Sequence, residues 1–138
     1  MFAKALEYHL RGLQFAEQKN FKIYIGSADV NLSTFYNGLG EDQKSRDALK
    51  KAITIMEETG NKKGVCAAWC NLASSCYLMD SLPQALIAFQ KGLEFAQELK
   101  QTSYKAHTHS GLRQVHIELG HFQTADSLLN LAYRLALQ

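Results

Sequence analysis

The chain has 138 residues, of which 46% are hydrophobic and 20% are charged, and these values are typical of one globular domain. Its net charge of +2 is too small for the strong basic field that nucleic-acid binding requires. No stretch is long and apolar enough to span a bilayer, so we expect a cytoplasmic protein with neither a nucleic-acid nor a membrane partner.

The spacing of apolar residues predicts helices along the whole chain. In the segment 63–79, apolar residues return at steps of three and four, which places them on one face of a helix. Pro83 falls in the first turn of the next helix, where its missing N–H is not needed. Gly40 and Gly120 follow helices at positions that favour a left-handed C-cap. The predicted helices cover residues 2–19, 22–39, 43–59, 63–79, 82–100, 103–119 and 122–137.

The same residue types also return every 40 residues, as Leu32, Leu72 and Leu112 illustrate. A fixed period in this range is typical of a stacked helical solenoid, in which neighbouring units cover each other's apolar faces. We therefore expect an all-α fold, a right-handed solenoid of antiparallel helix hairpins that forms a single domain over residues 1–138. The expected parts are residues 1–21, which match only the second helix of a repeat, and the hairpins 22–61, 62–101 and 102–138.

The central unit carries apolar residues of alternating size, namely Trp69, Leu72, Ala73, Cys76, Ala85, Phe89 and Gly92. These columns resemble the tetratricopeptide repeat, whose signature has a W-x₂-L-G-x₂-Y half followed by an A-x₃-F half. The period here exceeds the usual length of about 34 residues, so the resemblance is to the long, 40-residue type. It implies a non-catalytic scaffold for protein–protein interaction, with a concave groove lined by the first helix of each hairpin.

Polar and small residues occupy the groove face that the resemblance implies. Asn31 and Asn71 occupy the same column, and a carboxamide can both donate to a peptide carbonyl and accept from its N–H. Alternatively, these asparagines bond across adjacent helices or to water. The columns contain no lysine or arginine, which argues against a clamp for a C-terminal carboxylate. The predicted peptide-binding residues are Asn31, Thr34, Asn71, Ser74, Tyr77 and Gln114.

Nothing in the sequence points to catalysis. The motifs of phosphate-binding loops, dinucleotide sites and zinc hydrolases are missing. Four histidines lie between residues 107 and 121, but none of them has the i, i+4 spacing beside a carboxylate that helical zinc sites use. Cys66, Cys70 and Cys76 have helical spacing and no second pair for a metal, so we expect reduced, buried thiols. We expect no catalytic residue, no metal site and no cofactor.

The favoured function is the binding of a protein or peptide segment in the groove. The alternative is a self-association module, or the sensory or regulatory portion of a larger protein. The last predicted helix, 122–137, is apolar nearly all round, as a helix covered on two sides would be. It therefore predicts either a fragment of a longer solenoid or homo-association through the terminal helices, with Leu128, Leu131 or Leu135 in the contact.

Overall fold

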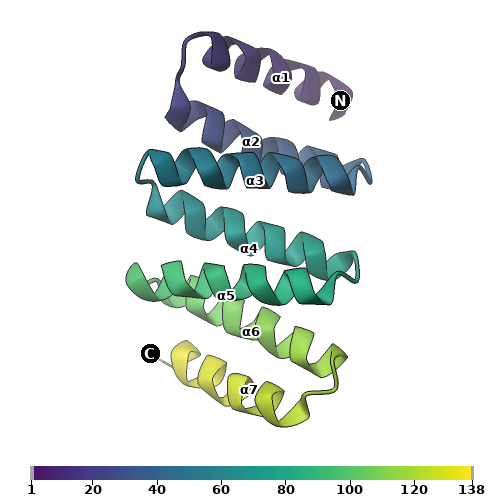
Figure 1. Ribbon diagram of the computed structural model, residues 1–138, viewed down its shortest axis with the longest axis vertical. Coiled ribbons are helices and arrows are strands. Elements are labelled where there is room, and N and C mark those ends of the chain that lie inside the picture. The colour runs from purple at the N-terminus through teal and green to yellow at the C-terminus, as the bar shows by residue number, and fades with distance from the viewer. Residues whose placement is uncertain (1, 138) are drawn as a thin grey trace. The chain divides into compact units, whose positions relative to one another are not determined.

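The computed structural model describes residues 2–137, with every side chain in that range except those of 2, 132 and 135. These residues form seven α-helices and no strand (Figure 1). The all-α prediction is confirmed, and every predicted helix boundary lies within two residues of the observed one. The helices are α1 (Phe2–Gln18), α2 (Lys22–Gly38), α3 (Asp42–Glu58), α4 (Lys62–Leu78), α5 (Leu82–Glu98), α6 (Thr102–Glu118) and α7 (Phe122–Ala136).

Each pair of consecutive helices is joined by a turn of three residues whose middle residue has a positive φ angle. A residue in the left-handed conformation turns the chain so that the N–H of the following residue can bond to a carbonyl oxygen in the last turn of the helix. After Gly40, for example, the Glu41 N–H donates to the Tyr36 carbonyl oxygen at 2.8 Å. A left-handed C-cap was predicted at Gly40 and Gly120, and the positive φ angles of both residues confirm the two predictions. The six middle residues are Asn20, Gly40, Gly60, Asp80, Lys100 and Gly120.

The chain divides into two compact units, Met1–Ala68 and Trp69–Gln138, and the division falls inside α4. In the first unit, α2 packs against both α1 and α3. In the second unit, α6 packs against both α5 and α7. The helices of both units are joined by short turns, so helices that follow one another within a unit form antiparallel hairpins.

One hydrophobic cluster in the core of the first unit is built on one face of α1 and one face of α2, while α3 adds buried residues such as Leu49 and Met56. Tyr36 and Ile55, which are partly buried, pack against this cluster. Gly26 lets α2 approach α3 closely, because a Cβ atom at this position would lie 3.0 Å from Met56 Cγ. The buried members of this cluster are Leu13, Ala16, Ile25, Ala28 and Leu32.

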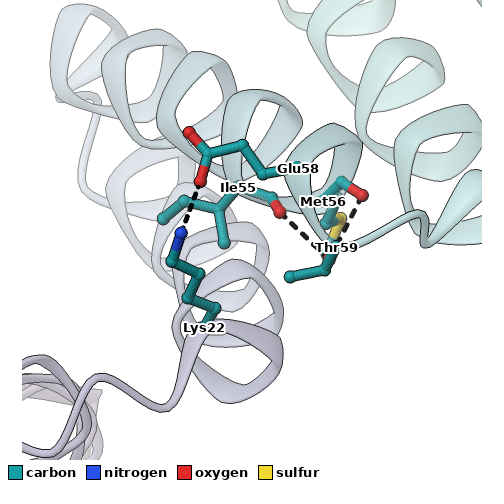
Figure 2. Close-up of polar contacts among 5 residues, drawn as sticks. All are labelled: Lys22, Ile55, Met56, Glu58 and Thr59. Carbon is teal, nitrogen blue, oxygen red and sulfur yellow. Dashed lines mark hydrogen bonds and ion pairs between the residues drawn. The ribbon is translucent and has the colours of Figure 1, made fainter.

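Polar contacts fix the ends of α2 and α3 against each other. Lys22 Nζ lies 2.9 Å from Glu58 Oε2, and this ion pair joins the start of α2 to the end of α3 (Figure 2). The Thr59 hydroxyl donates to the carbonyl oxygens of Ile55 and Met56, at 3.0 and 3.2 Å. The same carbonyl oxygens also accept from the backbone N–H groups of Thr59, at 3.1 Å, and of Asn61, at 2.9 Å, so the threonine hydroxyl adds a second donor to each at the end of α3.

The second unit buries the residues that the repeat pattern predicted to be core. Leu72 and Phe89 are 4% and 3% exposed, which confirms that prediction. Gly92 allows a close crossing, since a Cβ atom there would lie 3.2 Å from Cys70 Sγ and 3.3 Å from Thr108 Cγ2. Trp69, from the same set of columns, is covered less completely than Leu72 and Phe89. It is half-buried, and its Nε1 has no hydrogen-bond partner among the described residues.

Two further sequence predictions concern the cysteines and the membrane. Cys66, Cys70 and Cys76 are buried and form no disulfide, as expected. Across the described residues, no helix combines the length and the apolar character needed to cross a bilayer.

Candidate functional site

In the first unit, the predicted groove residues Asn31 and Thr34 lie on α2. Both are exposed, and their spacing of three residues places them on the same helix face. Within the part of the chain that the structure describes, neither side chain makes a hydrogen bond. Their donors and acceptors therefore remain available to an incoming segment.

In the second unit, Asn71, Ser74 and Tyr77 follow one another along α4 at three-residue steps. Asn71 is exposed. The Ser74 hydroxyl donates back to the Cys70 carbonyl oxygen at 3.0 Å, so that hydroxyl is already committed to its own helix. Tyr77 reaches away from α4 and donates to Glu118 Oε1 at 3.3 Å.

Gln114, on α6, meets the same carboxylate. Its Nε2 donates to Glu118 Oε1 at 3.3 Å. Tyr77 and Gln114 therefore converge on one oxygen of Glu118, and this shared acceptor links α4 to α6. Tyr77 and Gln114, both predicted to bind the peptide, therefore lie close enough to act in one site. The residue that brings them together is Glu118, which the sequence analysis did not name.

A cavity of about 290 Å³ lies between these residues. It is near the lower end of the range for small-ligand pockets, roughly 300–1,000 Å³, a size that suits one side chain of a partner better than a whole cofactor. Three predicted residues line it, Ser74, Tyr77 and Gln114, whereas Asn71 does not. The other lining residues are Leu78, Phe89, His107, Ser110 and Gly111.

The ring of Phe89 forms the apolar floor of this cavity. It comes from α5 and can extend toward α6 only because residue 111 is glycine. A Cβ atom at Gly111 would lie 2.2 Å from Phe89 Cζ, which is far inside van der Waals contact. His107 packs edge-to-face on the same ring, with ring centroids 6.1 Å apart. Gly111 thus has a physical role in the site, although in the sequence it only interrupts the column of asparagines.

The sequence pattern did not identify Leu78, Phe89 or Glu118 as site residues. Phe89 was assigned to packing between helices, and its burial supports that role as well. Leu78 is the last residue of α4 and is 82% exposed, which the helical period alone could not reveal. A signal for Glu118 did exist, since it lies four residues after Gln114 and therefore on the same face of α6.

The structure also shows what other chemistry the described residues offer. They include no group of three or more His, Cys, Asp or Glu side chains placed to hold a metal ion. Two histidines do meet: His116 Nδ1 lies 3.3 Å from His121 Nδ1, so one ring can donate to the other if their tautomers differ. Burial, and then the neighbouring His121, lower the pKa of His116 below its ordinary value of 6.5.

Comparison with known proteins now identifies the repeat. A model of the tetratricopeptide repeat matches residues 24–98, a little over half of the chain. The chain belongs to the tetratricopeptide repeat family. Members of this family mediate protein–protein interactions through non-catalytic repeats. The match does not address the 40-residue subtype, which stays a prediction, although equivalent helices do begin 40 residues apart at 22, 62 and 102.

Two similar proteins are both longer than this chain. The Tonsoku-like protein of Danio rerio is 25% identical over 109 residues, which are 79% of this chain and 8% of that protein. The crystal structure of BtubC (BKLC) from P. vanneervenii matches with a TM-score of 0.91 at 17% identity. That match covers 99% of this chain and 57% of the other. The chain therefore spans less than two thirds of either protein, and the structural match supports the fold alone.

Proposed function

We propose that the protein is a non-catalytic scaffold that binds an extended segment of a partner protein. The first-helix faces of its repeats would supply the contacts, from Asn31 and Thr34 in the first unit and from four residues in the second. Those four are Asn71, Ser74, Tyr77 and Gln114. Membership of the tetratricopeptide repeat family supports a role in protein–protein interaction. The six residues named above, as the contacts with the bound segment, are what we propose in addition.

The cavity of the second unit carries this proposal. It has an apolar floor, Phe89, and a rim of side chains that offer hydrogen bonds, including Tyr77 and Gln114. An apolar floor with a few convergent polar groups is the usual composition of a recognition pocket. Exposed, unbonded amides such as that of Asn31 suit the main chain of a bound segment, which has both donors and acceptors to satisfy.

The proposal includes no catalysis and no nucleic-acid partner. The cavity residues contain no pair of nucleophile and base at hydrogen-bond distance among the described side chains. A net charge of +2 gives little attraction to a polyanion. We place the protein in the cytoplasm, because three cysteines without a disulfide suit a reducing compartment.

A pull-down from cell lysate tests the proposal. The bait is the full chain, compared with the variant Asn31→Ala/Asn71→Ala and with Tyr77→Ala. Truncation of a side chain that contacts the partner should weaken the capture of a specific partner about tenfold, or about 1.4 kcal/mol. Asn130→Ala, an exposed asparagine on α7, is the matched control and should capture the partner as the parent does. If both groove variants capture every partner as the parent does, the proposed groove is wrong.

A second candidate function is self-association, because α7 leaves large apolar side chains uncovered. Leu129 and Tyr133, one turn apart on the same face of α7, are 46% and 64% exposed, and Leu131 is 42% exposed. Exposed apolar patches mark contact surfaces. Size-exclusion chromatography of the groove variants separates the two functions, since groove binding predicts unchanged oligomeric state. A regulatory portion of a longer protein would also be compatible with the limited share of both similar proteins that the chain spans.

A further inference from the structure

We infer that the cavity of the second unit selects a partner segment carrying an apolar side chain and a basic side chain two residues apart. This inference rests on the proposed function and adds the chemistry of its ligand. The apolar side chain would enter the cavity over Phe89, and the lysine or arginine would pair with Glu118.

The apolar half of the site is formed by side chains from α4 and α5. The floor is Phe89, which is 3% exposed in the absence of a ligand. Leu78 stands at the rim and is 82% exposed, so an incoming aliphatic or aromatic group would cover it. Burial of apolar surface contributes about 25 cal/mol per Å², and a bare leucine beside an apolar floor therefore favours an apolar occupant.

The charged half of the site is the Glu118 carboxylate. Oε1 accepts from Tyr77 and from Gln114, both at 3.3 Å, and these two neutral donors hold the group in place without neutralising it. Among the side chains that the structure describes, Glu118 forms no ion pair. Of the described residues lining the cavity, none is lysine or arginine. A basic group is the complement that this carboxylate lacks.

The geometry of α6 sets the spacing between the two halves. Glu118 lies four residues beyond Gln114, which corresponds to about 6 Å along the helix axis. In an extended chain, residues i and i+2 point to the same side and lie about 6.6 Å apart. A segment that runs along α6 can therefore place one side chain in the cavity and the next side chain on that face beside Glu118.

Selection from a displayed library of random seven-residue peptides tests this specificity. With the full chain as target, we expect enrichment of peptides with Leu, Ile, Met, Phe, Tyr or Trp two positions from Arg or Lys. Fluorescence anisotropy on the enriched peptides should show that Glu118→Gln weakens binding about two- to fivefold, the scale of an exposed ion pair. It should also show that salt weakens binding to the parent more than binding to this variant.

Charge reversal gives the decisive comparison. A selection on Glu118→Lys should replace the basic residue by Asp or Glu at the same spacing, while the apolar position is retained. Glu118 is exposed and ends its helix, where lysine is well tolerated, so this variant should fold. Glu57→Gln, an exposed glutamate in the last turn of α3, removes the same charge elsewhere and should select the same peptides as the parent.

The outcomes separate this inference from the function on which it rests. The selected peptides could lack a basic residue and still bind less tightly to Asn71→Ala and to Leu78→Ser. That outcome would overturn the charge selectivity but would still support groove binding. An unchanged preference on Glu118→Lys would do the same. Peptides indifferent to all these variants, or the absence of any enriched peptide, would overturn both the inference and the proposed function.

Discussion

Asp29 is a carboxylate placed inside the first unit with little to compensate its charge. It is 2% exposed on α2, and its Oδ2 has no hydrogen-bond partner among the described atoms. Lys51 Nζ lies 3.5 Å from that oxygen but only 2.6 Å from Glu17 Oε1. Burial raises the pKa of Asp29 above its ordinary value of 3.8, and the Lys51 charge offsets part of this effect.

The Asp29–Lys51 pair leads to a stability prediction. Lys51→Met should lower the free energy of unfolding at pH 7 by about 1–3 kcal/mol, because it leaves a buried carboxylate unpaired. Asp29→Asn should be neutral or stabilising by up to about 1 kcal/mol. Urea denaturation measures both changes, with Lys50→Met, an exposed neighbour on α3, as the control. A parental value for Lys51→Met would show that Asp29 does not depend on the lysine.

The pH dependence of the stability change caused by Asp29→Asn follows from the direction in which the pKa of Asp29 is shifted. A pKa raised in the folded state means that the folded protein binds the proton more tightly than the unfolded chain. The resulting stabilisation is fully present below pH 3.8 and is lost as pH rises through the raised pKa. Any gain from Asp29→Asn should therefore be seen at neutral pH and disappear near pH 4.

His109 has the opposite pH dependence. It is 5% exposed on α6, and burial followed by the Lys105 charge lowers its pKa below 6.5. The stabilisation from a neutral His109 is present above pH 6.5 and is lost as pH falls through the lowered pKa. His116 acts in the same direction. The free energy of unfolding should thus fall on acidification below pH 6.5.

Replacing His109 tests its share of this acid sensitivity. In urea titrations between pH 7.5 and pH 5, His109→Leu should lose stability less steeply than the parent. The slope should differ by up to about 1.4 kcal/mol per pH unit, the value for one proton. Equal slopes for the parent and the variant would mean that His109 does not titrate differently in the folded and unfolded states.

At the scale of elements, the six turns share one backbone conformation but differ in how well their residues suit it. The middle residue is glycine at three turns, whereas Lys100 adopts the same left-handed region with φ of 54°. This region costs a residue with a Cβ atom roughly 1–2 kcal/mol, and asparagine and aspartate tolerate it better than lysine does. Lys100 is therefore the turn residue least suited to its backbone.

Lys100→Gly should raise the free energy of unfolding by about 0.5–1 kcal/mol, since relief of strain exceeds the added flexibility of the unfolded chain. The control is Lys50→Gly, which places glycine in the exposed middle of α3 and should lower stability by about 1 kcal/mol. Thermal and urea unfolding report both effects. If Lys100→Gly lowered the free energy of unfolding as much as Lys50→Gly does, strain at the Lys100 turn would be excluded.

The helices could be predicted from sequence because their signals are local. Apolar residues at steps of three and four, with glycine at residues 40 and 120, place boundaries within two residues of those observed. The candidate site could be predicted only in part. Tyr77 and Gln114 were found by their column, but their shared acceptor Glu118 depends on how α4 and α6 face each other. The role of Gly111 likewise depends on the position of the Phe89 ring, which no local pattern contains.

Trp69 shows why side-chain burial is harder to predict than helix position. The repeat pattern places it on the apolar face of α4, and that placement is correct. Its indole nevertheless remains half-buried, because the extent of burial depends on the neighbouring helices and on the size of their side chains. Sequence columns report which face a residue occupies, and tertiary packing decides how much of it is covered.

At the scale of the whole molecule, each compact unit leaves part of its apolar surface exposed. In the first unit, Phe15 and Phe21 contact each other edge-to-face with centroids 6.4 Å apart, yet both remain more than half exposed. In the second unit, most of the exposed large apolar side chains lie on α7. The side chain of Leu135, which was expected in a terminal contact, lies outside the described residues. Repeats of this kind gain much of their stability by covering such faces with a neighbour.

We therefore expect the chain to self-associate through α7 as concentration rises. Leu131→Lys places a charge at an exposed apolar position of α7 and should shift the association to about tenfold higher protein concentration, because burying an unpaired ammonium group opposes the contact. Ile87→Lys, which charges an exposed position on α5 (57% exposed), should leave the association unchanged. Light scattering over a concentration series measures the shift. A parent chain that stays monomeric throughout, or equal effects of the two lysine variants, would exclude α7 as the contact surface.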